Sequence, residues 1–265
     1  MKKILVCIKA VTDLPPLLRM APDIPWVSDA ETGEYRINRF DEFALEEAIR
    51  IREKLPHVTV DALSVGPDHI RNALRRAMAI GADNGIHIRH ESRGFSDAQH
   101  VAELIAGYAA TGQYDLILTG VMAEDDMQGL VGPFVADLLG LPCATVVVRQ
   151  DLNLSENTIR VACELEAGLS ELVELRLPAL LSIQTGINRP RYPSLSNMLR
   201  SRTKELTTID APPSEKSRLP FLVNSIQEPV DESRCTFIGG SAEEKAVALL
   251  KIFSEKSLLR QRMGS

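Results

Sequence analysis

Residues 119–133 combine the residue types that bind a phosphate-bearing ligand. An apolar run ends at Gly120, and a helical pattern begins near residues 128–132. The first turn of a helix presents free N–H groups and the positive end of the helix dipole, so it attracts anions. Gly129 and Gly132 would let a phosphate approach the backbone, because they carry no side chain. The stretch predicts an anion site, with an ordinary strand-to-helix connection as the alternative.

Two acidic residues lie in the same loop. Asp125 and Asp126 are of a type that caps a helix or accepts a hydrogen bond from a ribose hydroxyl. They would also repel a phosphate placed too near them. In the alternative interpretation, an aspartate caps the helix and the loop binds no ligand.

Three more loops are expected at the same edge of a sheet. They span residues 9–16, 37–42 and 64–67, and each adjoins a short apolar run or a helical pattern. Ligands of open α/β sheets bind beyond the carboxyl ends of the strands, so converging loops would form one site. The alternatives are a helix-terminal turn residue for Asn38 and a core packing residue for Phe40.

The elements that would position these loops alternate along the chain. Short aliphatic runs end at glycine, proline or charge, which is typical of parallel strands covered on both faces. These runs span residues 4–10, 58–65, 85–90, 116–120, 144–149 and 179–184. Amphipathic helical patterns fall between the first five runs. The alternation predicts an α/β fold with a doubly wound, mostly parallel sheet.

The pattern changes in the last third of the chain. Residues 158–164 and 172–177 alternate apolar and polar side chains, which predicts an antiparallel hairpin appended to the sheet. Residues 187–234 are rich in proline and show little periodicity, so we expect an extended excursion. An amphipathic helix is expected over residues 241–258, either docked on a partner or packed back on its own sheet.

Composition excludes several classes of protein. The 265 residues are 45% hydrophobic and 25% charged, as in a globular protein, with a net charge of −6. No basic field is present, so nucleic acid is not an expected partner. No apolar segment reaches the roughly 18 residues of a membrane span, so no membrane insertion is expected. The four scattered cysteines form no C-x-x-C pair, so a zinc ribbon, a thioredoxin motif or a cysteine-ligated cluster is not expected. Three of them lie in apolar surroundings, as expected for buried thiols in a reducing, cytoplasmic compartment.

Motifs of common catalytic sites are missing. The chain has no G-x-x-x-x-G-K-[ST], no G-x-G-x-x-G after the first strand and no G-x-S-x-G. No nucleophile, base or metal cluster stands out. The residues alone therefore indicate a protein that binds a small anionic ligand rather than a catalyst.

Short fragments along the chain occur in a defined order and spacing. They span residues 4–9, 37–42, 46–48, 63–67, 81–87, 115–120, 141–142, 177–179 and 188–195, with Gly132 in the loop. In this order they resemble the β subunits of electron transfer flavoproteins, over almost the whole chain. The resemblance implies a Rossmann-like adenine-nucleotide-binding domain, residues 1–186. A recognition loop and C-terminal arm that wraps the partner subunit, residues 187–265, would follow.

The resemblance also implies a function. Members pair with a larger α subunit that holds most of a redox-active FAD, and the β subunit covers part of it. The β subunit holds AMP with a structural role, or a second FAD in electron-bifurcating members. Electrons come from acyl-CoA-type dehydrogenases and pass to a membrane quinone oxidoreductase. We therefore expect an electron carrier rather than a classical enzyme.

The family's nucleotide contacts fall in the loops already singled out. They match Cys7, Asn38, Arg39, Phe40, Asp41, Val65, Gly120, Val121, Met122, Ala123, Asp125, Asp126, Met127, Gln128, Gly129, Leu130 and Val131. Phe40 also matches a position that approaches the flavin ring. Leu195, with Tyr192 beside it, matches the anchor of the recognition loop, residues 183–205, that docks the dehydrogenase. A leucine packed internally is the alternative.

The phosphate loop departs from the family's pattern. Many AMP-binding members have Asn-Gln-Thr-Gly where this chain has Gly-Leu-Val-Gly at residues 129–132, so backbone N–H groups must hold the phosphate. AMP is expected because residues 38–47 follow the AMP class. A second FAD is the alternative because residues 131–132 follow bifurcating members. A stand-alone adenine-nucleotide-binding protein of universal-stress type and an adenylyl-transferring enzyme are less favoured alternatives.

Overall fold

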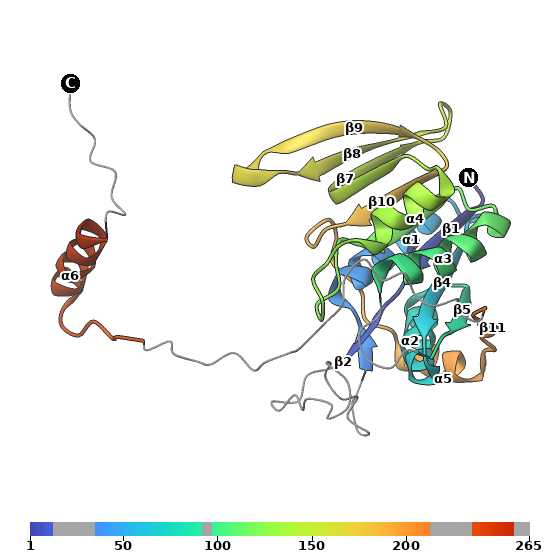
Figure 1. Cartoon of the computed structure of the whole chain (residues 1–265), viewed down its shortest axis with the longest axis horizontal. Helices are drawn as coiled ribbons and strands as arrows, with labels where there is room; N and C mark the ends of the chain where they lie inside the picture. The colour runs from blue at the N-terminus through green and yellow to red at the C-terminus, as the bar shows by residue number, and fades with distance from the viewer. Residues whose placement is uncertain (13–34, 92–96, 213–234, 257–265) are drawn as a thin grey trace. The chain divides into compact units, whose positions relative to one another are not determined.

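The computed structural model describes residues 1–12, 35–91, 97–212 and 235–256 (Figure 1). The chain divides into a main unit, Met1–Ile226, and a C-terminal unit, Gln227–Ser265. The main unit contains one large sheet covered by helices, and the candidate site lies in this unit.

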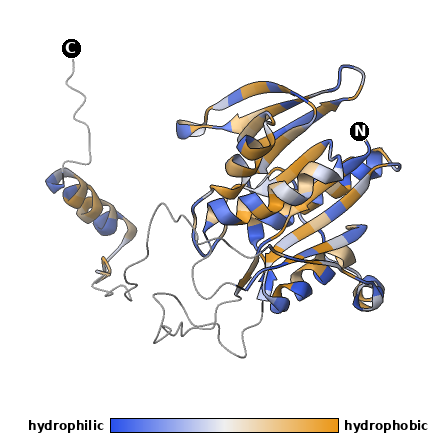
Figure 2. Cartoon of the chain, turned by 45° about the vertical axis from the view of Figure 1, so that its right-hand side comes forward, coloured by the Kyte–Doolittle hydropathy of each residue, from blue (hydrophilic) through white to orange (hydrophobic). Residues whose placement is uncertain are grey.

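The large sheet confirms the expected α/β architecture. Its strand order is β11-β5-β4-β1-β6-β10-β7-β8-β9, and the pairs from β11 to β7 are parallel. The parallel strands that the sequence predicts are β1 (Lys3–Cys7), β4 (Thr59–Gly66), β5 (Asn84–Arg89), β6 (Leu116–Gly120), β7 (Cys143–Asn153) and β10 (Ala179–Ile183). Figure 2 shows hydrophobic residues along the large sheet, and the central strands β1, β4, β6 and β10 are buried over most of their length, as expected for strands covered on both faces.

Helices cover both faces of the sheet. On one face, α1 (Arg39–Lys54) and α2 (Arg71–Ile80) pack against even-numbered core residues of β1, such as Ile4 and Val6. On the other, α3 (Ala98–Gly112) and α4 (Val131–Leu139) pack against Leu5 and its neighbours. Adjacent residues of β1 therefore pack into the two core layers on opposite faces of the sheet. This is why the sequence of the strand is continuously apolar.

The appended hairpin is also confirmed. Strand β8 (Thr158–Glu164) pairs antiparallel with β7 and with β9 (Ser170–Arg176). A short 3-10 turn, η2 (Glu166–Gly168), connects β8 to β9. The alternating pattern identified this part of the sheet because each strand has one covered face.

The expectation of an extended excursion after residue 186 is wrong for the part that the structure describes. This stretch contains helix α5 (Leu195–Thr203) and strand β11 (Thr207–Asp210), and β11 pairs parallel with β5. Leu206 packs over Gly85, where an added Cβ would lie only 2.5 Å from the leucine Cδ2. Both elements are too short to generate a visible period, so the sequence pattern did not reveal them.

Three other short elements were not expected. Strands β2 (Ala10–Thr12) and β3 (Tyr35–Ile37) form a small antiparallel sheet, and η1 (Asp68–Ile70) precedes α2.

In the C-terminal unit, α6 (Ala242–Glu255) lies within the expected helix, whose residues 257–258 fall outside the described residues. Ser241 and Glu244 form a capping box at its start. Among the helices of the described residues, none is long and apolar enough to cross a membrane.

The strand order places a ligand site at one point of the sheet edge. From β1, the chain first builds outward through β4 and β5, and then returns to place β6 on the other side of β1. In doubly wound sheets, the crevice at this reversal lies beyond the carboxyl ends of the two strands. The residues that follow β1 and β6 therefore define the candidate site.

Candidate functional site

Asp41 joins the carboxyl ends of β1 and β6. Its Oδ2 accepts a hydrogen bond from the backbone N–H of Lys9 at 2.7 Å, and its Oδ1 accepts one from Gly120 at 3.0 Å. Burial raises the pKa of this carboxyl to about 7, opposed by these two N–H groups and the Lys9 ammonium. A Cβ at Gly120 would lie 2.4 Å from Oδ1, so only glycine fits this approach.

Asn38 fixes the loop after β6 rather than capping its own helix. It occupies the N-cap position of α1, but within the described structure its side chain makes no capping hydrogen bond. Its Nδ2 instead donates to the carbonyl of Met122 at 2.8 Å, and its Oδ1 accepts from the N–H of Glu124 at 3.1 Å. The side chain is buried, so this pair of bonds is shielded from water.

Lys9 holds the two aspartates of the loop. Its Nζ lies 2.7 Å from Asp125 Oδ1 and 2.9 Å from Asp126 Oδ2. Asp126 also accepts a hydrogen bond from the N–H of Gln128, at 3.1 Å. In the described structure neither aspartate caps α4, whose N-cap is Leu130 without a side-chain cap bond. The interpretation of an aspartate-capped helix is therefore wrong. The Lys9 ammonium also reduces the repulsion that the Asp125 and Asp126 carboxylates would exert on a phosphate.

Glu124 lies in the predicted loop, but sequence reasoning gave it no role. Its Oε2 lies 2.6 Å from the Arg36 guanidinium and accepts a hydrogen bond from the N–H of Arg39 at 3.0 Å. Although partial burial raises the pKa of Glu124, these two contacts outweigh it and lower the value overall. Nothing in the local sequence shows this contact, because Arg36 is 88 positions away.

The approach to α4 is a backbone cradle lined by unsatisfied polar atoms. Gly129 has φ +66°, and a Cβ there would lie 3.0 Å from the carbonyl oxygen of Val121. A Cβ at Gly132 would lie 2.7 Å from Thr119 Oγ1. Thr119 Oγ1 and Gln128 Oε1 are buried without a hydrogen-bond partner in the described structure. The Thr119 hydroxyl and the backbone N–H groups at the uncapped helix start can donate to a phosphate, whereas Gln128 Oε1 is an acceptor and adds nothing to this fit.

The remaining predicted nucleotide residues differ in burial. Cys7 is buried at the end of β1, and burial raises the pKa of its thiol. Phe40 is half-buried, and its Cβ would lie 2.6 Å from a Cβ at Gly120. Val65 lies half-buried in β4, and Val121 is buried. The other members differ in exposure: Arg39 and Met127 are exposed, while Met122, Ala123, Leu130 and Val131 are half-buried.

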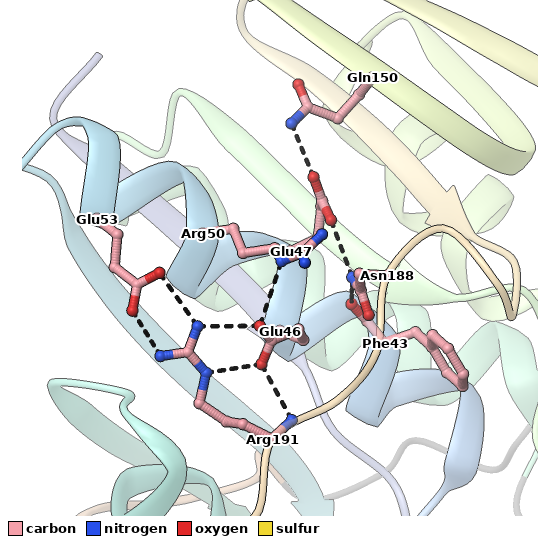
Figure 3. Close-up of polar contacts among 8 residues, drawn as sticks. All are labelled: Phe43, Glu46, Glu47, Arg50, Glu53, Gln150, Asn188 and Arg191. Atoms are coloured by element: carbon pink, nitrogen blue, oxygen red, sulfur yellow. Dashed lines mark hydrogen bonds and ion pairs between the residues drawn. The ribbon is translucent and has the colours of Figure 1, made fainter.

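A second polar cluster lies on α1 and holds the chain that follows β10 (Figure 3). The Arg191 guanidinium contacts Glu46 through Nε at 2.8 Å and Nη2 at 2.9 Å. It also contacts Glu53 through Nη1 at 2.5 Å. The Glu46 side chain is 3% exposed, so Arg191 neutralises a carboxylate buried on a helix. The fragments that resemble the family include Glu46 and Arg191, but the resemblance gives neither residue a role.

Glu47 anchors the same segment at a second point. Its Oε2 accepts a hydrogen bond from Asn188 Nδ2 at 2.9 Å, and its Oε1 accepts one from Gln150 Nε2 at 2.8 Å. Asn188 also donates to the carbonyl of Phe43 at 2.9 Å. Residues 188–191 are therefore fixed to α1, directly before the residues predicted to dock a partner.

The two predicted docking residues are exposed and take no part in the hydrogen bonds that Asp41 forms. Tyr192 is 88% exposed, and Leu195, the first residue of α5, is 69% exposed. Leu199 is 55% exposed one turn later. Residues four positions apart share a helix face, so the two leucines form one apolar strip. The alternative of an internally packed Leu195 is wrong.

Comparisons with known proteins point to one family. The electron transfer flavoprotein domain matches residues 26–214. The chain is 31% identical to an electron transfer flavoprotein subunit beta of Methylophilus methylotrophus over 261 residues, covering 96% of this chain and 98% of that protein. It is 33% identical to the mitochondrial subunit beta of Arabidopsis thaliana over 248 residues, covering 87% and 96%. It is 34% identical to the subunit beta of Bacillus subtilis over 179 residues, covering 67% and 68%.

Proposed function

The chain belongs to the electron transfer flavoprotein family as a β subunit, and from this we propose its cofactors and partners. It pairs with an α subunit and contributes to the environment of an FAD that the α subunit mostly holds. It binds AMP in the cradle between β6 and α4. The complex accepts electrons from an acyl-CoA-type dehydrogenase and passes them to a quinone oxidoreductase. The chain is thus part of an electron carrier.

The cradle at the start of α4 is the observation that carries the nucleotide assignment. Asp41 binds the N–H of Gly120, and Asn38 binds the carbonyl of Met122 and the N–H of Glu124, so the loop after β6 is held in place. This leaves the first turn of α4, together with Thr119 Oγ1, to receive a phosphate. The phosphate would contact backbone and a hydroxyl, which agrees with the glycines in the loop.

The FAD supplies the redox chemistry, and this chain would shape its surroundings. Phe40 lies half-buried at the start of α1, beside Gly120, where an aromatic ring can exclude water from a flavin. The C-terminal unit carries the amphipathic α6, whose exposed Leu249 and Leu250 would pack on the α subunit. In this proposal, both units of the chain therefore act together with the α subunit.

Analysis of released nucleotides tests the proposal. The chain would be coexpressed with its α subunit, and the purified complex denatured and its nucleotides separated by chromatography. One FAD and one AMP for each heterodimer are expected. Two FAD and no AMP would instead support an electron-bifurcating small subunit. A chain that purifies alone with bound ATP would support a universal-stress type protein, and a complex without flavin would contradict the proposal.

Replacing Gly129 by valine should release the nucleotide. A β-branched side chain would meet the Val121 carbonyl at 3.0 Å and would close the backbone approach to the phosphate. Because φ is +66°, the change also strains the loop by roughly 1–2 kcal/mol. We expect AMP content to fall by at least about tenfold, because losing the backbone contacts to the phosphate weakens the binding free energy by more than about 1.4 kcal/mol.

Gly140→Val is the matched control for this variant. Gly140 ends α4 with φ +63°, but a Cβ there meets no atom within 4 Å. The control carries the same backbone strain without obstructing the cradle, so it should retain AMP. Equal AMP content in both variants would show that the loop at residue 129 does not contact the nucleotide.

A further inference from the structure

Helix α5, which carries Leu195, is fixed near both of its ends by arginines. Arg191 lies four residues before the helix and is bound to α1, whereas Arg75 belongs to α2 and reaches the opposite end of α5. Figure 1 shows α5 beside α2 in the main unit. An exposed helix of nine residues would fray in isolation, because such short helices are marginal in water.

Arg75 supports the carboxyl end of α5. Its Nη1 lies 2.6 Å from the carbonyl oxygen of Arg202, 3.1 Å from that of Ser201 and 3.3 Å from that of Lys204. These carbonyls lie in the last turn, where a helix lacks internal donors. A guanidinium there also balances the negative end of the helix dipole. The two N–H groups of Nη1 are therefore shared among three backbone carbonyls at the end of α5.

Arg191 supports the segment that enters α5. It forms a two-point contact with buried Glu46 and a further contact with Glu53, while its own N–H donates to Glu46 at 3.2 Å. Both side chain and backbone are thus held on α1. Ser194 then caps α5 by accepting a hydrogen bond from Asn197 at 3.2 Å.

We infer that Arg75 and Arg191 are positioning residues that hold α5 as a preformed docking helix. This inference rests on the proposed docking role of Leu195. Neither arginine needs to touch the dehydrogenase, because each acts by fixing the helix that presents Leu195 and Leu199. A surface ordered in advance loses less conformational entropy when it binds, so the two residues increase affinity without adding contacts.

Limited proteolysis of the purified complex with trypsin tests the hold on α5 without a dehydrogenase. Trypsin attacks the carbonyl carbon of an arginine or lysine residue, and Arg75 binds the carbonyl oxygens of Arg202 and Lys204. Arg75→Ala should speed cleavage at these two bonds by roughly tenfold, since local opening becomes easier. Arg71→Ala is the control on the same helix, because among the described residues Arg71 forms a hydrogen bond only with Thr208 Oγ1, at 3.3 Å. Unchanged cleavage in Arg75→Ala would overturn the inference.

Electron-transfer kinetics test the consequence for docking. With an acyl-CoA dehydrogenase that reduces the wild-type complex, Arg75→Ala should raise the KM for the complex by roughly three- to tenfold at nearly constant kcat. Arg75→Lys should restore part of the loss, because an ammonium can still donate to the carbonyls. Arg191→Lys preserves a charge beside Glu46 but loses the forked contact, so its KM should also rise.

A double-mutant cycle with Leu195→Ala separates this inference from the proposed function. If Arg75 acts through the docking helix, Arg75→Ala should have little further effect on KM once Leu195 is gone. An equal effect in both backgrounds would overturn the inference. If Leu195→Ala alone leaves KM unchanged, the docking role fails, and the trypsin result still decides whether Arg75 holds α5.

Discussion

Leu195→Ala is expected to lower kcat/KM for electron transfer from the reduced dehydrogenase by roughly 30- to 150-fold, while FAD and AMP remain bound. Leu195 is 69% exposed at the start of a helix that the main unit holds in place. Truncating a central anchor of a protein interface costs about 2–3 kcal/mol, which corresponds to this fold-change. The nucleotides should stay because Leu195 lies outside the cluster around Asp41.

Rapid mixing of the dehydrogenase with the purified complex would measure this effect. Leu199→Ala should have a smaller effect in the same direction, since Leu199 lies one turn away on the same strip. Leu172, on β9, is 73% exposed and provides a matched control in which one exposed leucine is removed elsewhere. Wild-type kinetics in Leu195→Ala would refute the docking assignment. Equal losses in Leu195→Ala and Leu172→Ala would indicate a general loss of apolar surface instead.

The parallel core could be predicted from sequence because its signals are local. Runs such as residues 116–120 are buried on both faces and need no alternation, and each ends at a turn residue. Strand β11 gave no such signal. All four of its residues are exposed, and its pairing with β5 depends on Leu206 fitting over Gly85. Such an edge strand is defined by its tertiary neighbours rather than by its own pattern.

The location of the candidate site followed from topology, but its internal bonds did not. Loops after β1 and β6 must meet at the same edge, so their convergence could be expected. The pairing of Lys9 with Asp125 joins residues that are 116 positions apart. Glu46 and Arg191 are 145 positions apart, and Glu46 lies in a charged run typical of an exposed helix face. The burial of Glu46 could not be predicted from sequence, because it depends on the contact with Arg191 in the folded chain.

Asp41→Asn is expected to make the folded chain less sensitive to pH between 5 and 8. Burial raises the pKa of Asp41 from 3.8 to about 7, so the folded state binds the proton more tightly than the unfolded state. A raised pKa of this kind stabilises the fold fully below the unfolded value, and the contribution is lost as pH rises through about 7. A difference of roughly 3 pKa units corresponds to about 4 kcal/mol.

The measured quantity is the free energy of unfolding in urea, for wild type and variant, at several pH values. The wild-type value minus that of Asp41→Asn should fall by about 1.4 kcal/mol for each pH unit between 5 and 7 and level off above 8. The asparagine loses one acceptor for the N–H groups of Lys9 and Gly120, which lowers stability by about 1–3 kcal/mol at every pH. Because this loss is the same at every pH, it shifts the difference between the two unfolding free energies by a constant and leaves its slope with pH unchanged.

Neighbouring groups do not produce the same slope. The Lys9 ammonium stays charged over this range because Asp125 and Asp126 raise its pKa against the effect of burial, and the Cys7 thiol stays protonated because burial raises its pKa. Asp137→Asn, an exposed change on α4, is the control and should leave the slope unchanged. A difference curve that is flat or rises with pH would show that Asp41 is ionised in the folded state well below pH 7. The two N–H donors from Lys9 and Gly120 would then outweigh burial, and the carboxylate would hold the ends of β1 and β6 together as a permanent anion.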